Sequence, residues 1–149
     1  MNEAVTAHEI TIRRVFASPR DAVWAAWTQP DQLAAWWGPS GWSTPAGNVE
    51  IDLRPGGRLR VTSVSDDDGS EMTTTGTFTD VVAPERLAFD EASEDAWHDG
   101  ATSTITFTDL GDGRTEMVLR STVHTTDEMI VRAEAGMHGS LDRLGEHLR

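Results

Sequence analysis

Apolar and polar residues alternate along most of the chain, and this alternation predicts an antiparallel sheet. In the segment 8–16, Ile10 and Ile12 alternate with Thr11 and Arg13, as in a strand with one buried face. The same period of two recurs in the segments 49–54, 59–62, 72–82, 87–89, 102–108 and 117–123. These segments predict about seven strands, and their one-sided alternation is typical of an antiparallel sheet that is covered on one face only.

Turn-forming residues separate the predicted strands. Pro55-Gly56-Gly57 and Gly111-Asp112-Gly113 reverse the chain, and Asp66-Asp67-Asp68-Gly69 closes a hairpin, because Asp-Gly is a favourable turn pair. The three aspartates also suggest calcium. They lack the alternate ligand spacing and the distant glutamate of an EF-hand loop, so we interpret the run as a turn.

Two short helices are predicted after the first strand. Ser18 as N-cap, Pro19 at the first helical position and Asp21 three residues after the cap are typical of a helix start. Apolar residues at helical spacing continue this helix over 23–27. Pro30 begins a second helix that runs to Trp37, and the loop Gly38-Pro39-Ser40-Gly41 ends it.

A long helix is predicted at the end of the chain. It begins at the capping box Thr125-Thr126-Asp127-Glu128 and runs to about Leu148. Its length of about 22 residues corresponds to a rise of roughly 33 Å. One apolar stripe follows it, formed by Ile130, Ala133, Met137, Leu141, Leu144 and Leu148. Gly136 and Ser140 flank the stripe, where small side chains either leave a cavity or permit close packing on the sheet. Strands grouped apart from helices indicate the α+β class.

The length of 149 residues suits one domain, which we expect over 8–149 after a flexible tail at 1–7. No apolar run reaches the roughly 18 residues of a membrane span. The first residues lack the basic and apolar regions of a secretory signal, so we expect a cytoplasmic protein.

The charge and the residue types exclude several classes of function. The net charge is −13, with 25 acidic residues and no lysine, which argues against nucleic acid as a partner and favours solubility. Without cysteine, disulfides, thiolate zinc sites and cysteine nucleophiles are impossible. No nucleophile elbow, glycine-rich phosphate loop or His-x-x-x-His spacing occurs either. We therefore predict no catalytic residue, no metal ligand and no cofactor.

Five groups of residues match sequence motifs of a known family, in the same order along the chain. They are Arg14-Val15-Phe16-Ala17-Ser18-Pro19 with Val23-Trp24; Trp36-Trp37-Gly38-Pro39 with Gly41-Trp42; Asp52-Leu53-Arg54-Pro55-Gly56-Gly57; Gly76-Thr77-Phe78 leading to Val82-Ala83-Pro84-Glu85-Arg86-Leu87; and Gly136-Met137 through Leu141-Asp142-Arg143-Leu144. In these the chain resembles the bacterial relatives of the activator of heat shock protein 90 ATPase, in the START/SRPBCC superfamily that also contains the birch-pollen-allergen fold and polyketide cyclases. The resemblance implies a helix-grip fold, in which a curved antiparallel sheet surrounds the C-terminal helix and a cavity lies between them.

The implied cavity leads to a set of candidate ligand-binding residues: Trp42, Trp37, Arg14, Phe78, Phe107, Met117, Glu134, Met137, His138 and Leu141. Trp42 is expected at the cavity mouth, since aromatic side chains suit flat or hydrocarbon ligands. Trp36 is expected to pack the second helix onto the sheet. Trp24 and Trp27, at helical spacing, are expected in the core.

Arg14, Glu134 and His138 form the most specific polar hypothesis. Arg14 shares the inward face of the first strand, where a charge must be paired, and Glu134 and His138 lie one turn apart on the last helix. Either the three line the cavity together, or a bulge places Arg14 in solvent and the other two form a surface pair.

The acidic segment from Asp90 and Glu91 through Glu94 and Asp95 to the run 97–99 is also open to two interpretations. His98 beside Asp99 could hold a metal weakly, or the whole segment is an exposed, mobile loop that gates the cavity.

The function expected is non-enzymatic binding or transport of a hydrophobic small molecule, such as a lipid, a polyketide or an aromatic metabolite. One alternative, taken from the family resemblance, is a co-chaperone-like activator of the heat shock protein 90 ATPase, with that chaperone as partner. Another is a cyclase or hydrolase in which His138 and Glu134 exchange protons. We expect a monomer or a homodimer.

Overall fold

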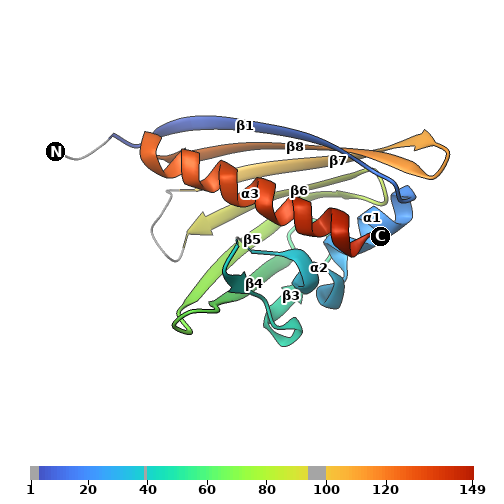
Figure 1. The fold of residues 1–149 in the computed structure, drawn as a ribbon. Coiled ribbons are helices and arrows are strands. Elements are labelled where there is room, and N and C mark those ends of the chain that lie inside the picture. The colour runs from blue at the N-terminus through green and yellow to red at the C-terminus, as the bar shows by residue number, and fades with distance from the viewer. Residues whose placement is uncertain (1–3, 39, 94–99) are drawn as a thin grey trace.

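The computed structural model describes residues 4–38, 40–93 and 100–149, and it shows a curved sheet with one long helix lying across its face (Figure 1). The strands are β1 (Thr6–Phe16), β2 (Trp42–Ser43), β3 (Val49–Ile51), β4 (Arg58–Ser65), β5 (Glu71–Val82), β6 (Arg86–Ser93), β7 (Ala101–Gly111) and β8 (Arg114–Thr125). The helices are α1 (Arg20–Thr28), α2 (Pro30–Trp36) and α3 (Asp127–His147), and a short 3-10 turn spans Ala46–Asn48. The α+β class and the helix-grip architecture are confirmed.

The described residues form one sheet of eight strands in the order β1-β8-β7-β6-β5-β4-β2, with β3 also paired to β4. Every pair is antiparallel. The strand beyond the expected seven is β2, which consists of Trp42 and Ser43 and pairs with the end of β4. Two residues are too few to show an alternation, so only the pairing reveals this strand.

Strand β3 ends earlier than predicted. The alternation continues through Leu53, but the strand stops at Ile51 and Leu53 is 38% exposed. The chain turns immediately afterwards, where the Gly57 N–H donates to the Arg54 carbonyl at 2.8 Å. A Cβ on Gly57 would lie 2.0 Å from the Asp52 carbonyl oxygen, so only glycine fits this turn.

The predicted cap of α1 is wrong. The helix begins at Arg20 after Pro19, and no side chain caps it. The Ser18 hydroxyl instead donates to the Leu148 carbonyl at 3.0 Å, at the far end of the chain. Ser18 is buried, and a carbonyl at a helix C-terminus lacks an intrahelical donor. The hydroxyl therefore satisfies the end of the last helix rather than the start of the first.

Helix α3 has the predicted cap within one residue and an unevenly buried stripe. Thr126 is the N-cap, and its Oγ1 accepts a hydrogen bond from the Met129 N–H at 3.2 Å. Leu141 and Leu144 are 2% and 0% exposed, whereas the stripe residues of the first turns are only partly buried. The C-terminal half of α3 is thus packed into the core, and its N-terminal half is less closely covered.

Helix α2 packs beside the C-terminal half of α3, and α1 packs against α2 and against β7 and β8 (Figure 1). The Trp36 indole Nε1 donates to the Ala26 carbonyl at 2.9 Å and ties the two short helices together. Trp24 packs edge-on against Phe107, with ring centroids 5.7 Å apart. Trp24 lies in the buried core, as predicted, whereas the hydrogen bond of Trp36 joins α2 to α1 and does not test the predicted packing of Trp36 on the sheet. Within the described ranges, no helix is long and apolar enough to cross a membrane.

Candidate ligand-binding cavity

A cavity of about 520 Å³ lies between the sheet and α3. The helix contributes residues from Met129 to Leu141, and β5, β6, β7 and β8 contribute inward-facing side chains. Ligand pockets commonly measure about 300–1,000 Å³, and an engineered apolar cavity of roughly 150 Å³ already binds benzene. The volume is therefore sufficient for an organic molecule.

Small side chains on α3 create much of this space. Ala133, Gly136 and Ser140 recur at spacings of three and four residues, and all three line the cavity. Farther along the same helix, Leu144 fills the corresponding position and is fully buried. Gly136 and Ser140 both line the cavity, and Ser140 also contacts the Gly38 carbonyl.

Tryptophans from α1, from α2 and its C-cap, and from β2 form an aromatic wall. Trp27, Trp36, Trp37 and Trp42 all line the cavity. The centroid of Trp27 lies 4.8 Å from that of Trp36 and 6.5 Å from that of Trp37, in edge-to-face contacts. Trp37 and Trp42 were candidates from the sequence, whereas Trp27 was assigned to the core. Trp27 is indeed buried, but it is also part of the wall.

Helix α3 holds the tryptophan loop in place. The Ser140 hydroxyl donates to the Gly38 carbonyl at 2.8 Å, and Arg143 Nη1 donates to the Trp42 carbonyl at 3.3 Å. Gly38 has a φ of +107°, a conformation that side-chain-bearing residues rarely adopt. The wall is therefore fixed by the same helix that forms the opposite side of the cavity.

One carboxylate lies among the apolar side chains. Glu91 lines the cavity from β6, on the same face as Phe89, and it is partly buried. Burial raises the pKa of Glu91 to about 7, with desolvation as the cause and no hydrogen bond or charge among the described residues opposing it. The prediction of a mobile loop is wrong for Glu91, because β6 continues to Ser93. The rest of that segment, from Glu94 to Asp99, lies outside the described residues.

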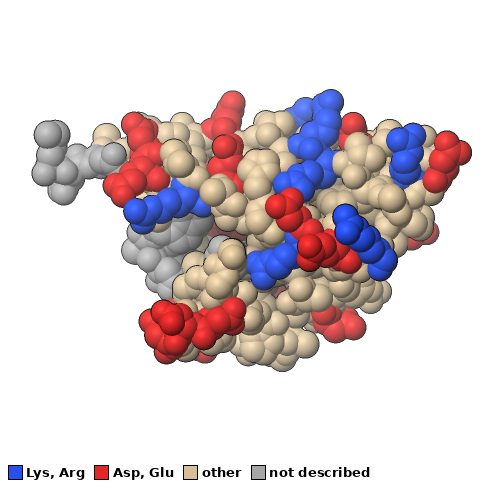
Figure 2. Space-filling model, viewed as in Figure 1, with Lys and Arg blue, Asp and Glu red and all other residues tan. Residues whose placement is uncertain are grey.

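Two further charged residues line the cavity and are exposed. Arg132 Nη2 donates to Glu128 Oε1 at 3.2 Å, and both side chains are well exposed at 70% and 62%. Glu71 is also exposed, at the start of β5. Acidic side chains gather beside it over the β4–β5 hairpin, where Asp66–Asp68 form the predicted turn (Figure 2). Acidic side chains thus lie at the β4–β5 end of the cavity, and the Arg132–Glu128 pair lies on α3.

The structure divides the sequence candidates into two groups. Trp42, Trp37, Met137 and Leu141 line the cavity. Phe78, Phe107 and Met117 face the interior but do not line it, since they are 2%, 2% and 0% exposed within the packed part of the core. The alternation shows which side chains face the interior, but it does not show whether they line the cavity or lie in the packed core.

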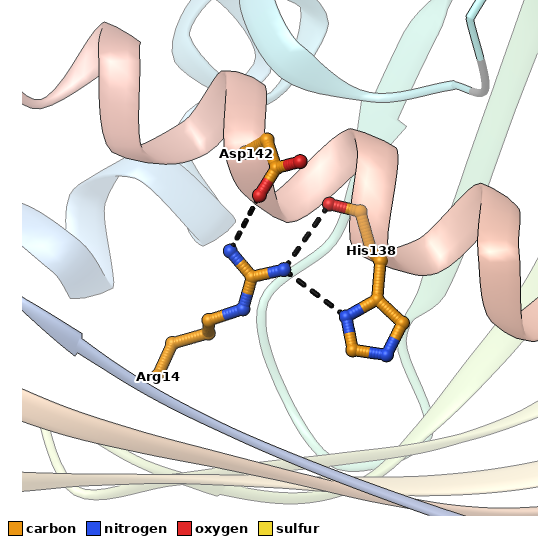
Figure 3. Close-up of polar contacts among 3 residues, drawn as sticks. All are labelled: Arg14, His138 and Asp142. Atoms are coloured by element: carbon orange, nitrogen blue, oxygen red, sulfur yellow. Dashed lines mark hydrogen bonds and ion pairs between the residues drawn. The ribbon is translucent and has the colours of Figure 1, made fainter.

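The Arg14 hypothesis needs correction (Figure 3). Arg14 points toward α3 as expected, without a bulge in the β1–β8 pairing. Its Nη1 donates to Asp142 Oδ1 at 2.7 Å, and its Nη2 donates to His138 Nδ1 at 3.1 Å and to the His138 carbonyl at 3.3 Å. Glu134 is exposed and is not part of this group. Since arginine only donates, Nδ1 of His138 is the acceptor.

This group ties β1 to α3 and does not line the cavity. Arg14 lies near the end of β1, which passes under the C-terminal half of the helix, so it reaches Asp142 rather than Glu134. His138 and Glu134 do not line the cavity, and the proton exchange considered for them stays a prediction. Across the described ranges, no cluster of three histidine or acidic side chains could hold a metal.

Comparison with known proteins gives a family and a set of structural relatives. The family described as Activator of Hsp90 ATPase homolog 1-like protein matches residues 17–149. A crystal structure of a protein from Chromobacterium violaceum has a TM-score of 0.82 at 24% identity, with 94% of this chain and 96% of that chain covered. None of the curated proteins compared with the chain matches it.

Two other solved structures carry the family's name. The AHSA1 protein from Silicibacter pomeroyi aligns with a TM-score of 0.82 at 25% identity, covering 95% of this chain and 97% of that chain. The AHSA1-like protein from Aeromonas hydrophila aligns with a TM-score of 0.74 at 29% identity, covering 94% of this chain and 91% of that chain.

Proposed function

The chain belongs to the Activator of Hsp90 ATPase homolog 1-like family, and we propose that it binds a hydrophobic small molecule in the cavity between its sheet and α3. The observation that carries the proposal is a cavity of about 520 Å³ with a wall of four tryptophans. A shared fold does not imply a shared function, so the proposal rests on this cavity and not on the family name.

The size of the cavity argues for an occupant. An unfilled apolar cavity costs about 24 cal/mol per Å³ in mutational series. This cavity is partly open to solvent, so water can enter it. Water relieves part of this cost, but it needs two to four polar partners and finds few of them on tryptophan, methionine and leucine. An apolar ligand suits these walls better.

The wall favours flat or hydrocarbon ligands, namely lipids, polyketides or other aromatic metabolites. Aromatic side chains offer large apolar surfaces with fixed orientation. From α3, Ser140 donates to the Gly38 carbonyl and Arg143 donates to the Trp42 carbonyl, so the wall is preformed and little ordering is needed on binding.

A thermal-shift screen of the purified protein against fatty acids, flavonoids, polyketides and steroids tests the proposal. A ligand at about 100 times its dissociation constant adds about 2.7 kcal/mol. For a domain of this length, that corresponds to a Tm increase of about 5–11 °C. Tryptophan emission should shift with the same ligand, because four of the indoles line the cavity.

Two matched variants on α3 locate the binding. Ala133→Phe places a ring in the cavity and should abolish the ligand-induced shift in Tm. Ala135→Phe makes the same change at an exposed position outside the cavity and should leave the shift intact. Trp42→Ala should weaken binding without loss of the fold. If no ligand class shifts Tm, or if Ala133→Phe binds as the wild type does, the proposal is wrong.

A further inference from the structure

We propose that Glu91 makes the cavity selective for apolar molecules that carry a basic amine. The carboxylate would bind the ammonium group, and the tryptophan wall would bind the hydrocarbon part. This inference rests on the proposed function of the cavity and specifies the chemical class of its ligand.

The sheet keeps the space around Glu91 open. In the register of β6 with its neighbours, Glu91 lies opposite Gly76 on β5 and Ala101 on β7. A Cβ on Gly76 would approach the Asp90 carbonyl oxygen to 2.9 Å, so no larger residue fits there without a shift. The carboxylate thus has neighbours without long side chains on both adjoining strands, and a ligand group can reach it.

Among the described residues that line the cavity, none is paired with Glu91 as a counter-charge. Among the described residues that line it, the other charged ones are Glu71 and Arg132. Arg132 is paired with Glu128 on its own helix, at 3.2 Å. Glu71 adds a second negative charge, and the net charge of −13 raises the local concentration of cations. A cationic ligand is therefore favoured over an anionic one.

The tryptophan rings also favour a cationic ligand. The face of an indole ring attracts a cation within about 6 Å of its centroid. An ionised carboxylate that is buried without a partner is costly, and burial accordingly raises the pKa of Glu91 to about 7. A bound ammonium supplies the missing partner and lowers that cost.

Calorimetric titration with decylamine, decanol and decanoate, each below micelle formation at pH 8, tests the inference. The three probes share one chain and differ in their polar group. Hydrogen bonds to charged groups contribute about 1.5–3 kcal/mol, which corresponds to about 10- to 100-fold in affinity. Decylamine should bind tighter than decanol by that factor, and decanoate should bind weakest.

Two variants of β6 assign the preference to one carboxylate. Glu91→Gln should remove the advantage of decylamine while decanol binding persists. Asp90→Asn removes the same charge from the adjacent residue, which is exposed and lies on the opposite face of the strand, and should keep the advantage. Because the two variants have the same net charge, general attraction of the amine to an acidic protein cannot explain a difference between them.

The affinity for decylamine should also depend on pH. From pH 6 to pH 8 the ionised fraction of a carboxyl with a pKa of about 7 rises about ten-fold, while an alkylamine with a pKa near 10 stays protonated. In the part of the chain that the structure describes, the charged groups that face the cavity beside Glu91 are Glu71 from β5 and Arg132 from α3. Binding of decylamine should tighten about ten-fold over this interval in the wild type, and binding of decanol should not change.

The outcomes separate this inference from the proposed function. If decanol binds and decylamine binds no tighter, or if Glu91→Gln keeps the preference for the amine, the role of Glu91 is wrong and the cavity remains a binding site. If neither these probes nor the screened ligands bind, the proposed function is itself overturned.

Discussion

Replacing Glu91 by glutamine should change the stability of the protein in a pH-dependent manner. Burial raises the pKa of Glu91 from 4.5 to about 7 in the folded protein, whereas the unfolded chain keeps the ordinary value. The folded protein therefore holds this proton more tightly than the unfolded chain does. The resulting contribution to stability is fully present below about pH 4.5 and is lost as the pH rises through about 7.

The size of the effect follows from the same two pKa values. Each pKa unit corresponds to about 1.36 kcal/mol, so an ionised Glu91 lowers the free energy of unfolding by about 3 kcal/mol at pH 8 and by less than about 1 kcal/mol at pH 5. Glutamine has nearly the same shape and does not ionise. The free energy of unfolding of Glu91→Gln should match that of the wild type at pH 5 within about 1 kcal/mol and exceed it by about 3 kcal/mol at pH 8.

Urea unfolding of the apo-protein at both pH values measures this difference, and thermal unfolding should show a Tm increase of about 6–12 °C at pH 8. Asp90→Asn, which makes the same change in charge on the exposed face of β6, should show no gain that depends on pH. Equal stability of Glu91→Gln and the wild type at pH 8 would refute the reasoning, since the carboxylate would then be fully hydrated in the folded protein.

Three variants test the contacts that position α3 beside the cavity. Leu144→Ala removes a fully buried side chain and should lower the free energy of unfolding in urea by about 2–5 kcal/mol; a loss below about 1 kcal/mol would contradict the central position of α3. Arg14→Ala breaks the contacts with Asp142 and should lower it by about 1–2 kcal/mol with ligand affinity unchanged in calorimetry; weakened binding would place Arg14 in the site. Thr126→Ala removes the α3 cap and should lower Tm by an amount equivalent to about 1 kcal/mol; an unchanged Tm would show that the cap is dispensable.

Most of the secondary structure could be predicted from the sequence because it depends on neighbours in the chain. A period of two identified β1 and β4 through β8, and a period near 3.6 with a threonine cap identified α3. The same local rules failed where a distant group competes for a side chain. Ser18 is a good N-cap by sequence, but it bonds the carbonyl of Leu148, which only the fold brings near.

Part of the candidate site could be predicted from the sequence for the same reason. Trp37 and Trp42 could be found because a cluster of tryptophans around a glycine-rich loop is a local signal. Phe107 and Met117 face inward but do not line the cavity, because alternation gives the inward face of a strand but not what lies opposite it. Arg14 was grouped with Glu134 and His138, and the structure brings it to His138 and Asp142, because the relative position of β1 and α3 is set by packing and not by spacing along the chain.

The sequence by itself determined the strands, the helices and the apolar character of the interior, since these follow from short-range periodicity and side-chain hydration. Alternation even carried a signal for Glu91, which continues the inward positions of Leu87 and Phe89. Whether that carboxylate meets water, a counter-charge or an apolar cavity was decided only by the tertiary structure. The ionisation of a side chain depends on everything within a few ångströms, and at Glu91 those surroundings come from strands and a helix far apart in the chain.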